Sequence, residues 1–131
     1  MIQIVKDSDT RPWFFLQTAH TTYGMWVMET GHLEHLYYGE RITVDSQDPA
    51  SCAPLVIQRG FAPGNTCTYD KEHPHISMED VCLEVGTLGK GDIREPFLEV
   101  RFTDGSVTSD FTFDSYEVLT LKEREQWLQD S

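Results

Sequence analysis

The chain has 131 residues, the size of one domain that can bury a hydrophobic core, so we expect one domain rather than two. Its 22 acidic residues outnumber its 10 basic residues and give a formal net charge of −12, which argues against a nucleic-acid partner because phosphate binding requires a basic patch. No apolar run resembles a signal peptide or a membrane span, so we expect a cytoplasmic protein without a membrane partner.

The first 44 residues contain four short runs of aromatic and β-branched residues, which are typical of strands. Small polar residues and glycine separate the runs, as in the turns of a meander. The runs are IQIVKD (2–7), PWFFLQT (12–18), TTYGMWVME (21–29) and HLEHLYYGERITV (32–44). They predict four consecutive antiparallel strands.

Residues 45–76 lose this periodicity and are rich in proline and glycine. A long loop of this kind is unusual in a compact domain and is often functional. The strand pattern resumes near Ile76 and continues to Tyr116. Within it, alternating apolar residues flank Asp104-Gly105, the pair favoured in a two-residue hairpin turn, so we expect a β-hairpin there.

The end of the chain differs in kind. Thr120 precedes Glu123 by three residues, which is a capping-box signature, and Leu121, Trp127 and Leu128 suggest one apolar helical side. We therefore expect an all-β antiparallel sandwich over residues 1–118 and a short helix over residues 119–131.

Metal and cofactor chemistry are not indicated. Cys52, Cys67 and Cys82 are fifteen residues apart, whereas zinc sites draw on close pairs, and three cysteines in a chain of this kind fit a reducing compartment. His73 and His75 would share one side of a strand, but no third ligand stands at a suitable distance. The many carboxylates show no pattern that would select a catalytic pair, so we expect no metal, no cofactor and a largely solvated acidic surface.

Four segments in order carry a family resemblance: FLQT (15–18), TYGM (22–25), GHLEHLYYG (31–39) and GKGDIREP (89–96). Together they resemble the amino-terminal domain of glycoside hydrolase family 36 α-galactosidases. The chain departs from the family pattern at EVGTLG (84–89), where members usually carry an aromatic and proline-containing loop.

The resemblance implies a β-supersandwich of the galactose-mutarotase-like type that precedes a catalytic TIM barrel. The two catalytic aspartates of the family belong to that barrel, so this chain is expected to hold no catalytic residue and to be inactive alone. The resemblance also implies that the barrel of the whole enzyme hydrolyses terminal α-linked galactose from oligosaccharides. The implied partners are the barrel of the same parent chain, barrels of neighbouring subunits and, indirectly, the galactoside.

The resemblance also implies site residues. Asp48 and Arg59 fall in the stretch from which some members send an acid and an arginine to the substrate of an adjacent subunit. Arg94 could offer its planar guanidinium to a carboxylate or carbonyl across the interface, with Asp92 fixing the loop and Pro96 setting the start of the next strand. The alternative is an internal network, Asp92 with Arg94 or Arg94 with Glu95, that only holds the loop.

Two other functions remain open at this point. An independent carbohydrate-binding module would present exposed aromatic side chains as a flat platform, for which the candidates are Trp13, Trp26, Tyr37 and Tyr69. A mutarotase-like sugar epimerase would need two histidines and a carboxylate that converge on one concave sheet face.

Overall fold

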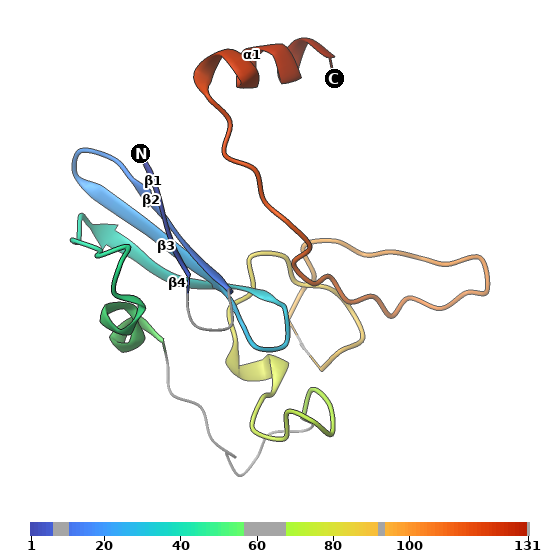
Figure 1. Cartoon of the computed structure of the whole chain (residues 1–131). Coiled ribbons are helices and arrows are strands. Elements are labelled where there is room, and N and C mark those ends of the chain that lie inside the picture. The colour runs from blue at the N-terminus through green and yellow to red at the C-terminus, as the bar shows by residue number, and fades with distance from the viewer. Residues whose placement is uncertain (7–10, 57–67, 92–93, 131) are drawn as a thin grey trace.

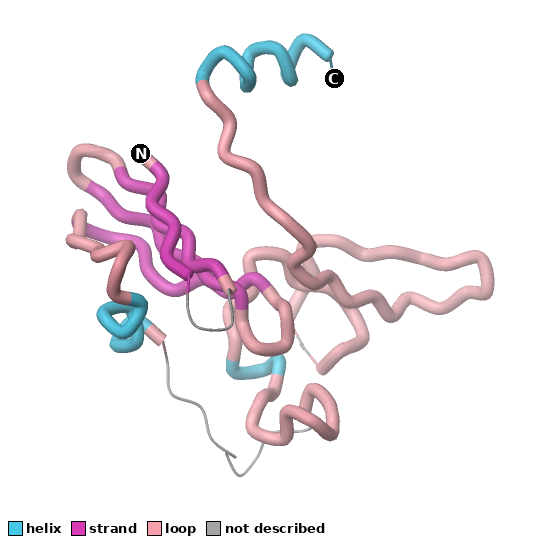
Figure 2. Tube along the Cα trace, viewed as in Figure 1, coloured by secondary structure: helices cyan, strands magenta, loops and turns pink. Residues whose placement is uncertain are grey.

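A four-stranded antiparallel sheet forms the amino-terminal part of the computed structural model, which describes residues 1–6, 11–56, 68–91 and 94–130 (Figures 1 and 2). The strands are β1 (Ile2–Lys6), β2 (Pro12–Gln17), β3 (Thr21–Val27) and β4 (Leu33–Glu40), and their order in the sheet is β1-β2-β3-β4. The predicted meander is confirmed.

One face of the sheet, here called the core face, carries the main hydrophobic cluster. Trp13 and Phe15 of β2 lie on this face and are opposite Trp26 and Gly24 of β3. Residues that follow the sheet cover it, because the short 3-10 helix η1 (Pro49–Leu55) brings the buried Cys52 and the partly buried Leu55 against it. The buried members of this cluster are Val5, Trp13, Phe15, Val44 and Cys52.

A second cluster lies beyond the end of β3. It joins Met28, at the start of the turn between β3 and β4, to residues around the 3-10 helix η2 (Met78–Asp80). Its buried members are Met28, Ile76, Met78 and Val81. Ser77 begins η2 by accepting a hydrogen bond from the Glu79 backbone N–H. This cluster attaches the irregular middle of the chain to the sheet.

The opposite face of the sheet, here called the open face, is only partly covered. Ile2, Leu16, Tyr23 and Tyr38 are consecutive register partners and therefore form one row across all four strands. Tyr38, at one end of the row, is 69% exposed, and Ile2 and Leu16 are also exposed. At another place on this face, the rings of Phe113 and Tyr116 contact Phe14.

The predicted β-hairpin is wrong because its two segments do not pair as strands, although the turn between them is present. The Phe102 N–H donates to the Ser106 carbonyl at 2.9 Å, and Gly105 has a φ of 89°, which glycine adopts without strain. No strand is assigned in residues 94–130, and Thr87–Leu98 is an isolated bridge. Phe102 and Phe111 of its apolar face are 47% and 42% exposed, and a two-stranded hairpin alone is marginally stable.

The residues from 97 to 119, here called the arm, form a long loop in Figure 1, return to the sheet where Phe113 and Tyr116 contact Phe14, and lead to the helix α1 (Leu121–Asp130). The predicted capping box is confirmed: the Glu123 carboxylate accepts from the Thr120 backbone N–H at 2.8 Å, and the Glu123 N–H donates to Thr120 Oγ1. No side chain of α1 is buried. The antiparallel β class with one short carboxy-terminal helix is confirmed.

None of the helices formed by the described residues is long and apolar enough to cross a bilayer.

Candidate functional site

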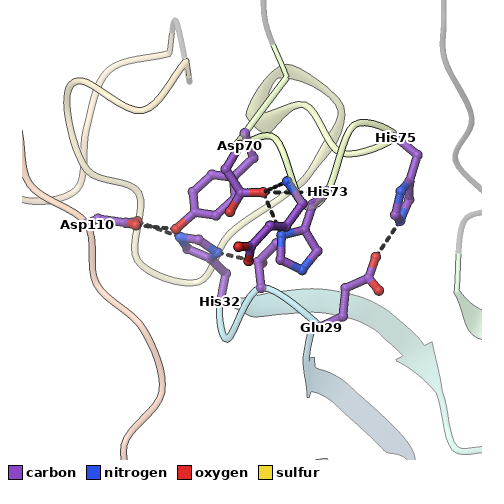
Figure 3. Close-up of polar contacts among 9 residues, drawn as sticks. Glu29, His32, Asp70, His73, His75 and Asp110 are labelled. Carbon is purple, nitrogen blue, oxygen red and sulfur yellow. Dashed lines mark hydrogen bonds and ion pairs between the residues drawn. The ribbon is translucent and has the colours of Figure 1, made fainter.

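Three segments that are distant in the sequence meet at the carboxylate of Asp110 (Figure 3). One oxygen, Oδ1, lies 2.5 Å from Nε2 of His32. The other, Oδ2, accepts a hydrogen bond from the Tyr69 hydroxyl at 2.5 Å. We call Asp110, His32 and Tyr69 the Asp110 hub. A single carboxylate thus joins the turn before β4, the middle of the chain and the arm.

The turn between β3 and β4 sets the position of His32. The Met28 N–H donates to the His32 carbonyl at 2.9 Å, and Gly31 has a φ of 87°, so the backbone turns sharply just before the histidine. Thr30 Oγ1 lies 2.7 Å from Nδ1 of His32. His32 is only 2% exposed and both of its ring nitrogens have a partner, as expected for a buried polar side chain. Neither nitrogen is therefore available to a ligand.

Tyr69 is the hydrogen-bond donor of the hub. Its ring packs edge-on against His32 at 4.9 Å between centroids, and Lys90 Nζ lies 6.0 Å above the ring. Burial, followed by the hydrogen bond to the Asp110 carboxylate, raises the pKa of Tyr69 well above its usual value. The phenol therefore keeps its proton, and with it the hydrogen bond, to a more alkaline pH than an ordinary tyrosine does.

The other histidines of this region contact separate carboxylates. Nδ1 of His73 lies 2.8 Å from Oδ1 of Asp70, and Nε2 of His75 contacts Glu29 (Figure 3). Nowhere in the described ranges do three His, Cys, Asp or Glu side chains lie where they could hold a metal ion. His73 and His75 therefore act as members of two local pairs.

A second polar cluster lies on the open face of the sheet. The Tyr23 hydroxyl is 2.6 Å and 2.8 Å from the two oxygens of Glu84, and Nδ1 of His35 is 3.5 Å from Glu84 Oε1. Burial and the neighbouring carboxylate raise the pKa of Tyr23 to about 12. One histidine meets one carboxylate here, whereas a mutarotase-like site would need two histidines, so this cluster does not supply that acid and base pair.

The aromatic side chains considered for a carbohydrate-binding platform do not form one. Trp13 is buried on the core face, and its ring centroid is 4.7 Å from that of Trp26. The Trp26 Nε1–H donates to Glu34, the Tyr37 hydroxyl donates to the Glu40 carbonyl, and Tyr69 belongs to the Asp110 hub. These rings are thus engaged in internal contacts and do not share one flat surface.

The site residues predicted from the sequence lie at different elements of the structure. Asp48 is exposed and caps η1, where its carboxylate accepts from the Ala50 N–H at 3.2 Å. Arg94 Nη2 donates to the carbonyls of Met78, at 3.1 Å, and Val81, so it holds both ends of η2.

Arg59 and Asp92 lie outside the described residues, and Pro96 follows Arg94 in an irregular segment without a strand. The contacts of Arg94 with η2 resemble the internal alternative in kind, although the partners are backbone carbonyls and not Asp92 or Glu95.

Sequence reasoning missed the Asp110 hub. In the expected hairpin, Asp110 belongs to the wet face, and nothing in the linear pattern distinguishes it from the other carboxylates of the arm. Its partners stand 78 and 41 residues earlier, so no local spacing connects them. The sequence offered only the position of His32 beside Gly31, and the burial of this histidine is visible only in the structure.

These features define an antiparallel β domain with a structural polar hub and, among the described residues, no group of three His, Cys, Asp or Glu side chains that could hold a metal ion. Residues 31–129 match the glycosyl hydrolase family 36 N-terminal domain. The chain therefore belongs to this family of amino-terminal domains.

The chain is 38% identical over 115 residues to the bifunctional alpha-galactosidase/sucrose kinase AgaSK of Mediterraneibacter gnavus, a match that covers 88% of the chain and 12% of that protein. It resembles the crystal structure of the alpha-galactosidase from Lactobacillus brevis with a TM-score of 0.71 and 29% identity, covering 86% of the chain and 14% of that protein.

The galactosidase domain of AgaSK is also similar, with a TM-score of 0.68 and 30% identity, over 87% of this chain and 15% of that structure. The chain thus spans less than one sixth of the length of these relatives.

Proposed function

We propose that this chain is the non-catalytic amino-terminal domain of a cytoplasmic α-galactosidase, and that it docks on the catalytic barrel to support oligomer assembly and to complete the sugar pocket. The hydrolysis of terminal α-linked galactose would then belong to the barrel. The relatives that are named alpha-galactosidases support the activity of the whole protein.

The observation that carries the docking role is the apolar surface of the carboxy-terminal third. Large apolar side chains from Phe97 to Trp127 are exposed, and none of α1 is buried. Soluble domains rarely expose apolar patches of this extent unless they bind a partner. A second protein surface would remove these side chains from water and supply the packing that the arm and α1 lack.

Pocket completion rests on fewer observations. Asp48 is exposed at the start of η1, where its position is fixed by the capping hydrogen bond, so its second carboxylate oxygen can accept from a sugar hydroxyl. Arg59 would act with it, as the resemblance implies. Arg94, Asp92 and Pro96 would shape the docking loop, because Arg94 fixes η2 relative to the residues that lead into the arm.

A chimera tests this function. The chain replaces the corresponding residues of the AgaSK galactosidase domain, and hydrolysis of a chromogenic α-galactoside is measured for the chimera, for the chain alone and for the catalytic part without an amino-terminal domain. We expect an active chimera with the oligomeric mass of the parent and no turnover by the chain alone. Turnover by the isolated chain, or an inactive chimera, would contradict the proposal.

Pocket completion has its own test within the active chimera. Asp48→Ala should raise the Michaelis constant severalfold with little change in kcat. The substitution removes a hydrogen bond that would stabilise the bound substrate and the transition state equally. Asp45→Ala, at another exposed position just before η1, is the matched control and should leave the Michaelis constant unchanged. Equal Michaelis constants for the two variants would remove Asp48 from the pocket.

A further inference from the structure

We infer that a cavity between the start of β4, residues 84–88 and the arm is a binding site for a small, uncharged aromatic molecule of one ring. This cavity, here called the Val85 pocket, has a volume of about 150 Å³. It is lined by Leu33, Val85, Phe111, Thr112 and Phe113. The ligand is a free small molecule, so the inference goes beyond the docking role proposed above and does not depend on it.

Three chain segments form the Val85 pocket, and each is joined to the other two by backbone hydrogen bonds. These bonds close a triangle around the cavity, so its walls are fixed relative to one another before a ligand arrives. A site that is already formed binds without the entropy cost of ordering its walls. The three pairs of N–H donor and carbonyl acceptor are Glu84 and Leu33 at 2.9 Å, Phe113 and Gly31 at 2.7 Å, and Ser109 and Leu88 at 3.0 Å.

Side-chain contacts hold the same three segments. The Thr87 hydroxyl donates to the Ser109 carbonyl at 2.8 Å and adds a second link between residues 84–88 and the arm. The Asp110 hub fixes the arm at the position just before the lining residues 111–113. The ring of Phe113 packs on that of Phe14, with 6.1 Å between centroids. The pocket is therefore held by side chains as well as by the backbone.

The volume and the lining of the pocket select one aromatic ring. Four of the five lining residues are apolar, and two of these are phenylalanines, whose rings can pack against another ring. An engineered protein cavity of about 150 Å³ with leucine, isoleucine and phenylalanine walls stays free of water and binds benzene or xenon. Phe111 is 42% exposed, so the Val85 pocket is open to solvent at this residue and a ligand can enter.

The pocket disfavours a charged ligand, and an anion most of all. Apolar walls offer no partner to a charge that leaves water, and burying an unpaired charge is costly. Glu84 precedes Val85 in the chain and Asp114 follows Phe113, within a chain whose formal net charge is −12. An aromatic carboxylate would be repelled by these acids, whereas an uncharged ring of the same shape would not.

Titration of the chain with phenol tests the inference, with NMR chemical shifts of the Leu33 and Val85 methyl groups as the readout. We expect saturable shifts and a dissociation constant on the order of 1 mM, as suits a ligand of about seven non-hydrogen atoms. Benzamide and benzoate then test the charge, because they share one shape and only benzoate is an anion at neutral pH. Benzoate should bind roughly tenfold more weakly than benzamide.

Two phenylalanines of the arm provide a matched pair of variants. Phe111→Ala removes one wall of the pocket and should weaken phenol binding roughly tenfold. Phe102→Ala is the control, because Phe102 is 47% exposed on the same arm but is not one of the described residues that line the pocket. Its affinity for phenol should equal that of the parent chain.

The size of residue 85 provides an independent readout. Val85→Phe places a ring in the pocket and should abolish the phenol-dependent shift of the Leu33 methyl groups. Val85→Ala enlarges the pocket, so the affinity for the two-ring molecule indole should rise severalfold relative to the affinity for phenol. Adventitious binding to the outer surface would leave this ratio unchanged.

Several results would overturn the inference. One is the absence of saturable shifts at the Leu33 and Val85 methyl groups, and another is an equal loss of phenol affinity in Phe111→Ala and Phe102→Ala. Equal affinities for benzamide and benzoate would contradict the exclusion of charge. Shifts of the same methyl groups that grow with protein concentration in the absence of phenol would show that a side chain of a second copy fills the pocket. If Val85→Phe does not fold, the Phe111 and Phe102 variants still decide the question.

Discussion

Replacing Asp110 by alanine tests whether the hub stabilises the domain. The substitution removes the acceptor of two hydrogen bonds, one from Tyr69 at 2.5 Å and one with His32 at 2.5 Å. Hydrogen bonds to charged groups contribute roughly 1.5–3 kcal/mol each to stability. Because the Asp110 side chain is 21% exposed, water can replace part of the lost interaction, and we take the lower values. The expected loss is about 3 kcal/mol in the free energy of unfolding.

The magnitude is measurable by urea unfolding followed through tryptophan fluorescence, since Trp13 and Trp26 report on the core face. A loss of this size lowers the melting temperature by roughly 10 °C in a domain of this length. Asp114→Ala is the matched control and should stay within about 0.5 kcal/mol of the parent, as exposed substitutions usually do.

The loss of unfolding free energy in Tyr69→Phe should lie between the losses in Asp110→Ala and Asp114→Ala. This substitution removes one of the two hydrogen bonds, and the expected cost is about 1.5 kcal/mol. Combined with Asp110→Ala, it should add less than its own effect, because both substitutions break the same bond. Equal stability of Asp110→Ala and Asp114→Ala, or full additivity of Asp110→Ala and Tyr69→Phe, would refute the hub.

Three further predictions concern single side chains. Tyr23 has a folded pKa near 12, raised above the value of the unfolded chain, so its contribution to stability is complete below pH 10 and is lost as pH rises toward 12; absorbance at 295 nm should show this late ionisation, and Tyr23→Phe should reduce its amplitude while the late ionisation of Tyr69 remains. Cys82 is exposed and Cys52 is buried with a raised pKa, so a thiol reagent should modify Cys82 quickly and Cys52 only at the rate of unfolding; equal rates would contradict the burial. Thr120→Ala should cost about 1 kcal/mol of helix stability, seen as lower ellipticity at 222 nm.

The sheet and the helix cap were predictable from the sequence because their signals are local. The alternation of apolar and polar residues in the four amino-terminal runs indicates which face of the sheet each side chain occupies. Short turns between consecutive strands then set which residues are register partners. The capping box needs only Thr120 and Glu123, three residues apart. Both features are decided by neighbours in the chain.

The hairpin and the hub were not predictable in the same way. Residues 98–113 alternate as strands do, but alternation stabilises a ladder only where a second layer buries the apolar face, and Phe102 and Phe111 have no such cover. The Asp110 hub depends on the three-dimensional approach of residues up to 78 positions apart. Because no short sequence spacing connects Asp110 to its partners, the sequence alone cannot distinguish the Asp110 carboxylate from an exposed one.

Restoration of activity in trans tests the docking role most directly. The AgaSK catalytic part without its amino-terminal domain is mixed with increasing amounts of this chain, and hydrolysis of a chromogenic α-galactoside is followed. A docking domain without catalytic residues predicts saturable restoration by the parent chain, none by the variant with serine at Phe97 and Phe102, and no hydrolysis by the chain alone. Full activity of the catalytic part without any chain, or hydrolysis by the chain alone, would contradict that role.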